Sequence, residues 1–499
     1  MLQKRRIFNE DGNILIMSVV IVALLIATGM GYMKWATDER WDTAYEQATV
    51  QAYFLAQTGL VERGLVYLRS RRPADLPTAS VFLNDGIIRD AGTFKNVKVM
   101  RVTTMGSGNI FQRSDTYDVF ATGVAKFRDH ALGNRTYGQD IEVQRTAKMR
   151  ARLRSFSNYM YLTHFEATSF NEIIWFWTYD SLWGRVHSND YIGLKYSPHF
   201  YGPVSTCKSE FLYFQPENIH FEYPPQFEVT PVLFPRTAET LRANANWVDG
   251  LGRYMTRVWL RGNAGITTYQ YELGENPPPV YGWEEGDVSN IQHQPMPAWG
   301  GLFVDGPAEV YGEVHGNITI GTSGDMYLVD DVYYSDVDPT NPGGLNNWAN
   351  INAHQYLCGL VSEGNIIIRD NDLNGKENGA ALGGQRFERH SITITAGLVA
   401  LGESFTFEHQ NDDWEAYQGP TPDERGIIHL RGAVTQLRRG YVHRSNHGTG
   451  IRDGTGYGKD YIYDFRFDMR PPPFYLEARD DEGYALFDII SFTELEPTR

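Results

Sequence analysis

The chain has 499 residues, of which 13% are aromatic, with 49 glycines and a formal net charge of −16. This length exceeds one ordinary hydrophobic core and predicts two or three domains, and the aromatic content excludes a disordered chain. The acidic balance argues against nucleic acid as a partner, because phosphate backbones attract basic surfaces.

An uncharged segment near the N-terminus is the most informative feature of the chain. Residues 13–33 (NILIMSVVIVALLIATGMGYM) follow a head that contains Lys4, Arg5 and Arg6. At about 1.5 Å of rise per residue, a helix of this length spans the ~30 Å hydrocarbon core of a bilayer. Because Lys and Arg stay on the cytoplasmic side, we expect everything after the span to be exported. A cleavable signal is the competing interpretation, but the run is too long and lacks an AxA site.

The helix is expected to continue into the exported space. Residues 35–68 contain no proline and place small or apolar residues at helical spacing, namely Ala44, Ala48, Ala52, Leu55, Ala56, Gly59 and Leu60. Pro73 and Pro77 then end the pattern. The sequence therefore predicts one helix over residues 13–72, with a membrane half and an amphipathic half.

A small antiparallel sheet is predicted over residues 78–167. The segments VKVMRVTTM, TYDVFATGVAKF and QDIEVQRTAKMRARL are rich in β-branched or aromatic residues and are bounded by turn formers. This sheet would pack on the exported half of the helix.

Residues 175–499 have a different sequence pattern, in which short apolar segments are separated by glycine, asparagine and aspartate. Stacked coils of such strands share a continuous core, which favours an interrupted right-handed parallel β-solenoid with inserted loops. A β-sandwich is the alternative. The glycine- and aromatic-rich stretch that ends in Pro471, Pro472 and Pro473 is expected to cap the solenoid. The predicted fold class is α+β.

The N-terminal region resembles that of type IV pilins. The resemblance rests on the short basic head that ends in Gly12, the uncharged run, and the AxxxAxxxAxxG-type continuation, and it covers residues 1–70. It is closest to PilX-type minor pilins and the large K-type pseudopilin of type II secretion. It implies that a prepilin peptidase cuts after Gly12, which leaves Asn13 as the new N-terminus.

This resemblance implies a structural subunit, not an enzyme, held in the bacterial inner membrane and then placed in a type IV pilus or type II secretion-like filament. Its partners would be other pilin-like subunits, with a glycan or surface as a further ligand. Small residues would let neighbouring helices approach closely, namely Ala23, Ala27, Gly29 and Gly31. The chain departs from most pilins at the fifth position after the cut, where Met17 stands in place of glutamate. A subunit without this acid fits the tip of a filament.

Two other functions stay open. A membrane-anchored β-solenoid enzyme acting on polysaccharides would use clustered acids on one sheet face. An envelope scaffold would use the helix only as an anchor. No GxSxG, Walker A or dinucleotide-binding motif is present in the sequence to favour an enzyme.

The two cysteines, Cys207 and Cys358, exclude a disulfide framework. In an oxidising compartment they would either form one bridge or stay as two independent buried thiols.

A calcium loop is partly matched by DNDLNG, with Asp370, Asp372 and Asn374 as candidate ligands. The twelfth position is Ala381, where the loop needs a bidentate glutamate. A solvated turn is therefore the first expectation and calcium the second, and no other cofactor is predicted.

Overall fold

The computed structural model describes the chain as two compact units, which are residues 1–153 with 487–499, and residues 154–486. The described residues are 10–102, 115–168, 171–250, 252–274, 277–336, 355–375, 390–410, 423–445 and 454–495. Ala381, the twelfth position of the candidate calcium loop, lies outside them.

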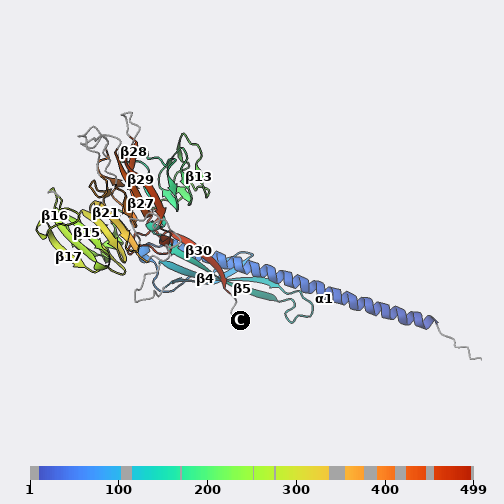
Figure 1. The fold of residues 1–499 in the computed structure, drawn as a ribbon. Helices are drawn as coiled ribbons and strands as arrows, with labels where there is room; N and C mark the ends of the chain where they lie inside the picture. The colour runs from blue at the N-terminus through green and yellow to red at the C-terminus, as the bar shows by residue number, and fades with distance from the viewer. Residues whose placement is uncertain are drawn as a thin grey trace, which may run out of the picture. The chain divides into compact units, whose positions relative to one another are not determined.

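A long helix forms the N-terminal part of the first unit (Figure 1). It comprises α1 (Glu10–Gly59), a π-helical turn η1 (Leu60–Leu65) and α2 (Val66–Arg69). A 3-10 turn, η2 (Pro73–Asp75), follows, because proline has no N–H to continue the ladder. The predicted end of the helix, before Pro73, is therefore close to the observed one.

An antiparallel sheet, called the head sheet below, completes the first unit. Its strand order is β1-β3-β4-β5-β30, with β2 paired to β3. The strands are β1 (Val81–Phe82), β2 (Gly86–Ile88), β3 (Gly92–Arg101), β4 (Thr116–Arg128), β5 (Asp140–Leu153) and β30 (Phe487–Leu495). β4 and β5 match the second and third predicted strands, and β3 overlaps the first, whose residues 103–105 lie outside the described part of the chain. β30 comes from the other end of the chain and pairs with β5 from Phe487↔Leu153 onward.

The second unit contains a large parallel sheet. The spatial order of its strands is β14, β18, β20, β22, β25, β27, β6, β8 and β11, and every neighbouring pair is parallel. The strands are β6 (Tyr161–Phe165), β8 (Val186–Ser188), β11 (Val204–Thr206), β14 (Asn246–Asp249), β18 (Gly300–Asp305), β20 (Asn317–Thr322), β22 (Leu357–Ser362), β25 (Gly397–Ala400) and β27 (Asp423–Arg438).

A second sheet takes the strands that lie between these in sequence. Its strands are β15 (Tyr254–Arg261), β16 (Ile266–Glu272), β17 (Ser289–Gln294), β19 (Ala308–Val314), β21 (Met326–Tyr334), β23 (Ile366–Ile368), β24 (Ile392–Ile394), β26 (Phe405–Phe407), β28 (His443–Ser445) and β29 (Gly454–Tyr463). From β15 through β19, β21, β23, β24 and β26 to β27 and β29 the pairing is parallel. β16, β17 and β28 add antiparallel strands at its ends. β27 pairs in both sheets and joins them.

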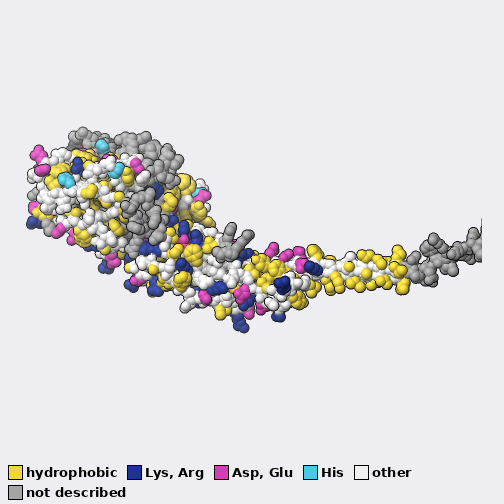
Figure 2. Space-filling model, turned by 90° about the horizontal axis from the view of Figure 1, so that it is seen from below, with side chains coloured by type: hydrophobic (Ala, Val, Ile, Leu, Met, Phe, Trp, Pro, Cys, Tyr) yellow, Lys and Arg dark blue, Asp and Glu magenta, His cyan; other side chains and the backbone are white. Residues whose placement is uncertain are grey.

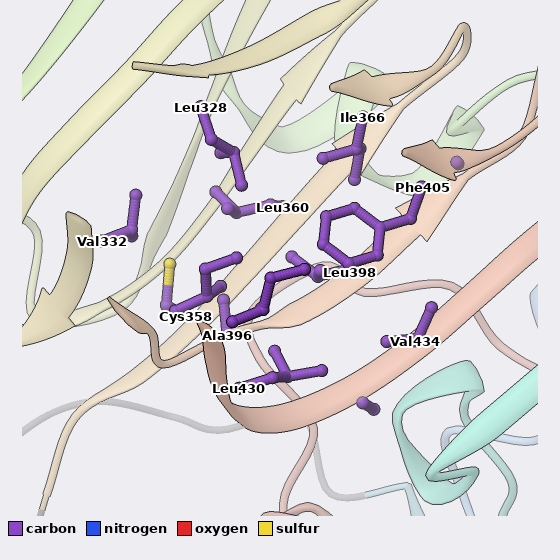
Figure 3. Close-up of a cluster of buried hydrophobic side chains, with 14 of the residues drawn as sticks. Leu328, Val332, Cys358, Leu360, Ile366, Ala396, Leu398, Phe405, Leu430 and Val434 are labelled. Carbon is purple, nitrogen blue, oxygen red and sulfur yellow. The ribbon is translucent and has the colours of Figure 1, made fainter. Parts of the chain in front are cut away.

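The core of the second unit lies between the two sheets (Figure 3). Aligned positions on successive strands all point apolar side chains inward, forming the ladder Leu302, Ile320, Leu360, Leu398, Val434, Tyr161, Val186 and Val204. Each of these side chains is at most 7% exposed. Burial of one such side chain is worth about 1.5–3 kcal/mol, so the ladder supplies much of the driving force for stacking.

Smaller elements extend the stack over residues 171–226. They are the parallel strands β7 (Ser181–Leu182), β10 (His199–Phe200) and β13 (His220–Phe221), and the parallel pair β9 (Gly193–Lys195) and β12 (Leu212–Phe214). Short helices cover the remaining turns, namely η3 (Phe156–Asn158), α3 (Glu239–Asn244), η4 (Gly262–Ala264), η5 (Glu285–Asp287) and η8 (Phe465–Asp468).

The observed units differ from the predicted domains in three respects. The predicted head sheet extended to residue 167, but the first unit ends at Leu153 and β6 belongs to the parallel stack. The predicted body extended to residue 499, but the chain returns to the head sheet at Phe487. The predicted cap contains β29, which is an ordinary parallel strand beside β27. In the first two cases the partner strand is distant in sequence, so the local sequence pattern could not reveal it.

Candidate assembly surface on the N-terminal helix

The first half of α1 is an uncovered apolar surface. The large apolar side chains between Ile14 and Met33 are 51–68% exposed. The helix is long and apolar enough to cross a membrane, and none of its most apolar stretch is buried. Figure 2 shows these side chains in yellow along the rod. Since each exposed Leu, Ile or Val forgoes about 1.5–3 kcal/mol, this surface requires lipid or protein around it.

The predicted packing residues lie on this surface. Ala23, Ala27 and Gly31 are four residues apart and so share one face of the helix. A Cβ built at Gly29 or at Gly31 would meet nothing within 4 Å. The face is therefore open to a second helix, which small side chains would allow to approach closely. Met17, in the place of the usual acid, is 68% exposed.

The second half of the same helix is packed on the head sheet. Ala48, Ala52 and Ala56 repeat at four-residue spacing, as predicted, and are at most 3% exposed. Trp41 stacks on Tyr45 at 5.2 Å between ring centroids. One helix therefore has a covered half and an uncovered half.

Glycines bring the helix unusually close to the sheet. A Cβ built at Gly123 of β4 would lie 1.9 Å from the carbonyl oxygen of Ala52, and one at Gly64 would lie 2.2 Å from Cγ1 of Val119. Gly64 lies in η1, whose Leu60 and Leu65 are buried. The helical pattern around Gly64 did not distinguish this residue, and Gly123 was not predicted as a contact site either. A glycine inside the strand pattern of β4 was the available signal, because such glycines often mark close backbone approach.

The predicted processing site lies at the start of the helix. Gly12 and Asn13 are in the first turns of α1, with helical backbone, and their side chains are outside the described part of the chain. The cleavage itself stays a prediction.

Both cysteines are free thiols in the structure. Cys207 Sγ lies 3.5 Å from Oδ1 of Asn189, whereas Cys358 is fully buried on β22. Burial raises the pKa of Cys207 to about 11 and that of Cys358 to about 12. Cys207 is partly buried and Cys358 is buried, and their pairing in an oxidising compartment stays a prediction.

The candidate calcium ligands are held by other protein groups. Asp370 Oδ2 is 2.5 Å from Nδ1 of His409, and the Asn374 side-chain amide donates to the Leu328 carbonyl at 2.7 Å. Asp372 is exposed in the turn between them. No group of three acidic, His or Cys side chains suited to a metal occurs among the described residues. These contacts describe a hydrogen-bonded turn, and calcium binding stays a prediction.

No protein-family model and no curated protein matches this chain. Among solved structures, the chain is similar to the competence-associated pilin ComZ from Thermus thermophilus, at 9% sequence identity and a TM-score of 0.29. The match covers 90% of this chain and 97% of that chain. These values do not establish a shared fold.

Proposed function

We propose that the protein is a pilin-like subunit that is stored in a membrane and assembles through the first half of α1. One observation carries the proposal: the same helix buries its second half on its own head sheet and leaves its first half uncovered. A soluble domain would not leave such a surface exposed. The expectation of a structural subunit, and not an enzyme, follows from this arrangement and from the sequence resemblance.

Assembly through this helix has a small free-energy cost. Lipid tails are about as apolar as leucine, so a helix loses little when it exchanges lipid for a neighbouring helix. What decides the exchange is the quality of packing, which the open face with Ala23, Ala27 and Gly31 favours. The partners would be other pilin-like subunits of a type IV pilus or type II secretion-like filament. Met17 supports placement at the filament tip, because a subunit without the usual acid does not need to add below another subunit.

The second unit would be the exported body. Its parallel ladders repeat every 18 residues where no insertion intervenes, as from Leu302 to Ile320 and from Val186 to Val204. This offset supports a β-solenoid, and the strong preference of parallel crossovers for one hand supports a right-handed coil. Such ladders differ from the antiparallel pairing of a β-sandwich.

The first test is the mass of the mature protein. Processing by a prepilin peptidase should give an N-terminus at Asn13, and Gly12→Ala should retain the first twelve residues. Gly29→Ala is the matched control, because its new methyl group meets nothing within 4 Å and should leave processing intact. A wild-type protein that retains Met1 would refute the proposal.

The second test measures assembly. Ala27→Leu enlarges a side chain on the open face and should lower the amount of the subunit in sheared filaments, while processing continues. Leu25→Ala is the control, since it removes bulk instead of adding it. Equal incorporation of Ala27→Leu and wild type would show that this face does not pack against other subunits.

A further inference from the structure

A cavity of about 840 Å³ opens in the second unit, between the segment 171–183 and the strands β27, β28 and β29. This is within the range of ~300–1,000 Å³ that is typical of small-ligand sites. Three tryptophans line it, Trp175, Trp177 and Trp183, and Tyr179 stands beside them with 75% of its surface exposed. The cavity combines aromatic faces with carboxylates, amides and hydroxyls.

The floor of the cavity is rigidly built. Arg439 is 2% exposed and lies 3.6 Å above the ring centroid of Phe176. Its Nη1 donates to Glu166 Oε2 at 2.9 Å and to the Ile174 carbonyl at 2.8 Å. Beside it, the amide of Gln436 donates to the hydroxyl of Tyr161 at 2.7 Å. This network fixes the floor before any ligand arrives.

The lining also contains a buried hydroxyl group, on Tyr461. Tyr461 is 8% exposed and its buried hydroxyl has no hydrogen-bond partner within the described part of the chain. A buried hydroxyl without a partner is costly, and it is uncommon in native structures. At the rim, Tyr196 has a φ of 59°, which a bulky side chain rarely adopts. Unsatisfied and strained groups of this kind concentrate at ligand sites.

Several charged groups around the cavity already have partners within the protein. Lys459 forms an ion pair with Asp180, and Tyr441 donates its hydroxyl to Glu172 at 2.8 Å. Lys195 lies over the ring of Tyr196 at 5.0 Å. A strongly charged ligand would have to displace these partners, so the cavity suits a neutral ligand.

We propose that this cavity binds a neutral oligosaccharide. A sugar ring has an apolar C–H face, which would stack on Trp177 or Trp175, and an equatorial belt of hydroxyls that both donate and accept. The hydroxyl of Tyr461 supplies one partner for that belt, and the carboxylates of Glu172 and Asp180 accept further hydrogen bonds without losing Tyr441 and Lys459, since an ionised carboxylate has about four acceptor sites. The binding site lies within residues 154–486 and does not depend on filament assembly.

The test uses the full chain, dispersed in a zwitterionic detergent that has no sugar headgroup. Titration calorimetry would be run with maltohexaose, cellohexaose, mannohexaose and N-acetylated chitohexaose. We expect at least one of them to bind and Trp177→Ala to weaken its binding about tenfold, which corresponds to about 1.4 kcal/mol. Trp247→Ala is the matched control, because Trp247 is 51% exposed on β14 and does not line the cavity.

A second pair of variants isolates the hydroxyl. Tyr461→Phe should weaken binding without lowering thermal stability, whereas Tyr475→Phe should leave binding unchanged. Tyr475 is the matched control because it is also buried and its hydroxyl has no partner among the described residues, but it packs in a separate cluster. The inference is overturned if none of the four oligosaccharides binds, if Trp177→Ala binds as well as wild type, or if hexagalacturonate binds more tightly than its neutral counterparts.

Discussion

The close approach of α1 to β4 can be tested at Gly123. In Gly123→Ala the new methyl carbon would lie 1.9 Å from the Ala52 carbonyl oxygen and 2.5 Å from the Ala56 nitrogen. Both are backbone atoms of the helix, so no side-chain rotation relieves the clash. Ordinary contact begins at 3.4 Å, which requires the helix to move by about 1.5 Å and opens gaps around Ala52, Leu55 and Ala56.

We expect Gly123→Ala to cost about 3 kcal/mol, at the upper end of the range for overpacking. Amide hydrogen exchange should report this cost as a more than hundredfold faster exchange of residues 46–59 and of β4. Amides of β18 and β20 in the second unit provide an internal reference. Gly31→Ala is the control, because its methyl group has open space and alanine favours helix by about 1 kcal/mol. Protection within twofold of wild type in Gly123→Ala would refute the packing described here.

Three further predictions concern the second unit. Burial raises the pKa of Asp331 to about 6, above the ~3.9 of an unfolded chain, so the native state binds the extra proton and stability falls as pH rises through this window. Asp331→Asn, which still accepts from the Thr393 N–H, should therefore raise the melting temperature at pH 7.5 and leave it unchanged at pH 3.5. Glu166→Gln leaves buried Arg439 without its counter-charge and should cost about 3–5 kcal/mol in urea unfolding, whereas the exposed Glu222→Gln should cost nothing measurable. Cys207 and Cys358 should both resist iodoacetamide at pH 8 in native protein and react fully in urea, and a bridged peptide in mass spectrometry would contradict this.

The helix was predictable because its signals are local. A long uncharged run, four-residue spacing of Ala48, Ala52 and Ala56, and a proline at residue 73 all act within a few turns. The π-helical turn at Leu60–Leu65 was not predictable, since its i→i+5 bonding has no residue signature. It coincides with Gly64, where the helix seats directly against Val119.

The body was predictable only in its strands, not in their partners. Val434 pairs with Tyr161 on the neighbouring strand, although Tyr161 lies near the start of the second unit's sequence and Val434 lies near its end. The cavity was missed for the same reason, because Trp177, Arg439 and Tyr461 become neighbours only through this pairing. The residue type alone did not distinguish Trp177 or Tyr461 from the aromatic residues of an ordinary core.

The order of strands explains how the second unit can be inserted within the chain that forms the head sheet. The chain enters the second unit in the middle of the stack at β6, proceeds to β11, resumes at the far end with β14, and returns to β27 beside β6. Entry and exit consequently lie together: the Arg154 N–H donates to the Leu486 carbonyl at 2.8 Å, and that of Ala478 donates to the Arg154 carbonyl at 2.7 Å.

The head sheet also requires that the chain leaves it and returns to it at adjacent positions. Leu153 and Phe487 are directly opposed on the neighbouring strands β5 and β30, about 5 Å apart. If the chain entered the parallel sheet at one edge and left it at the other, its entry and exit would be separated by the full width of the sheet. A long return segment would then be needed to bring the chain from β5 back to β30. Because the chain enters the parallel sheet in its middle, its entry and exit points are adjacent, and residues 154–486 can be inserted between β5 and β30 while these two strands stay paired.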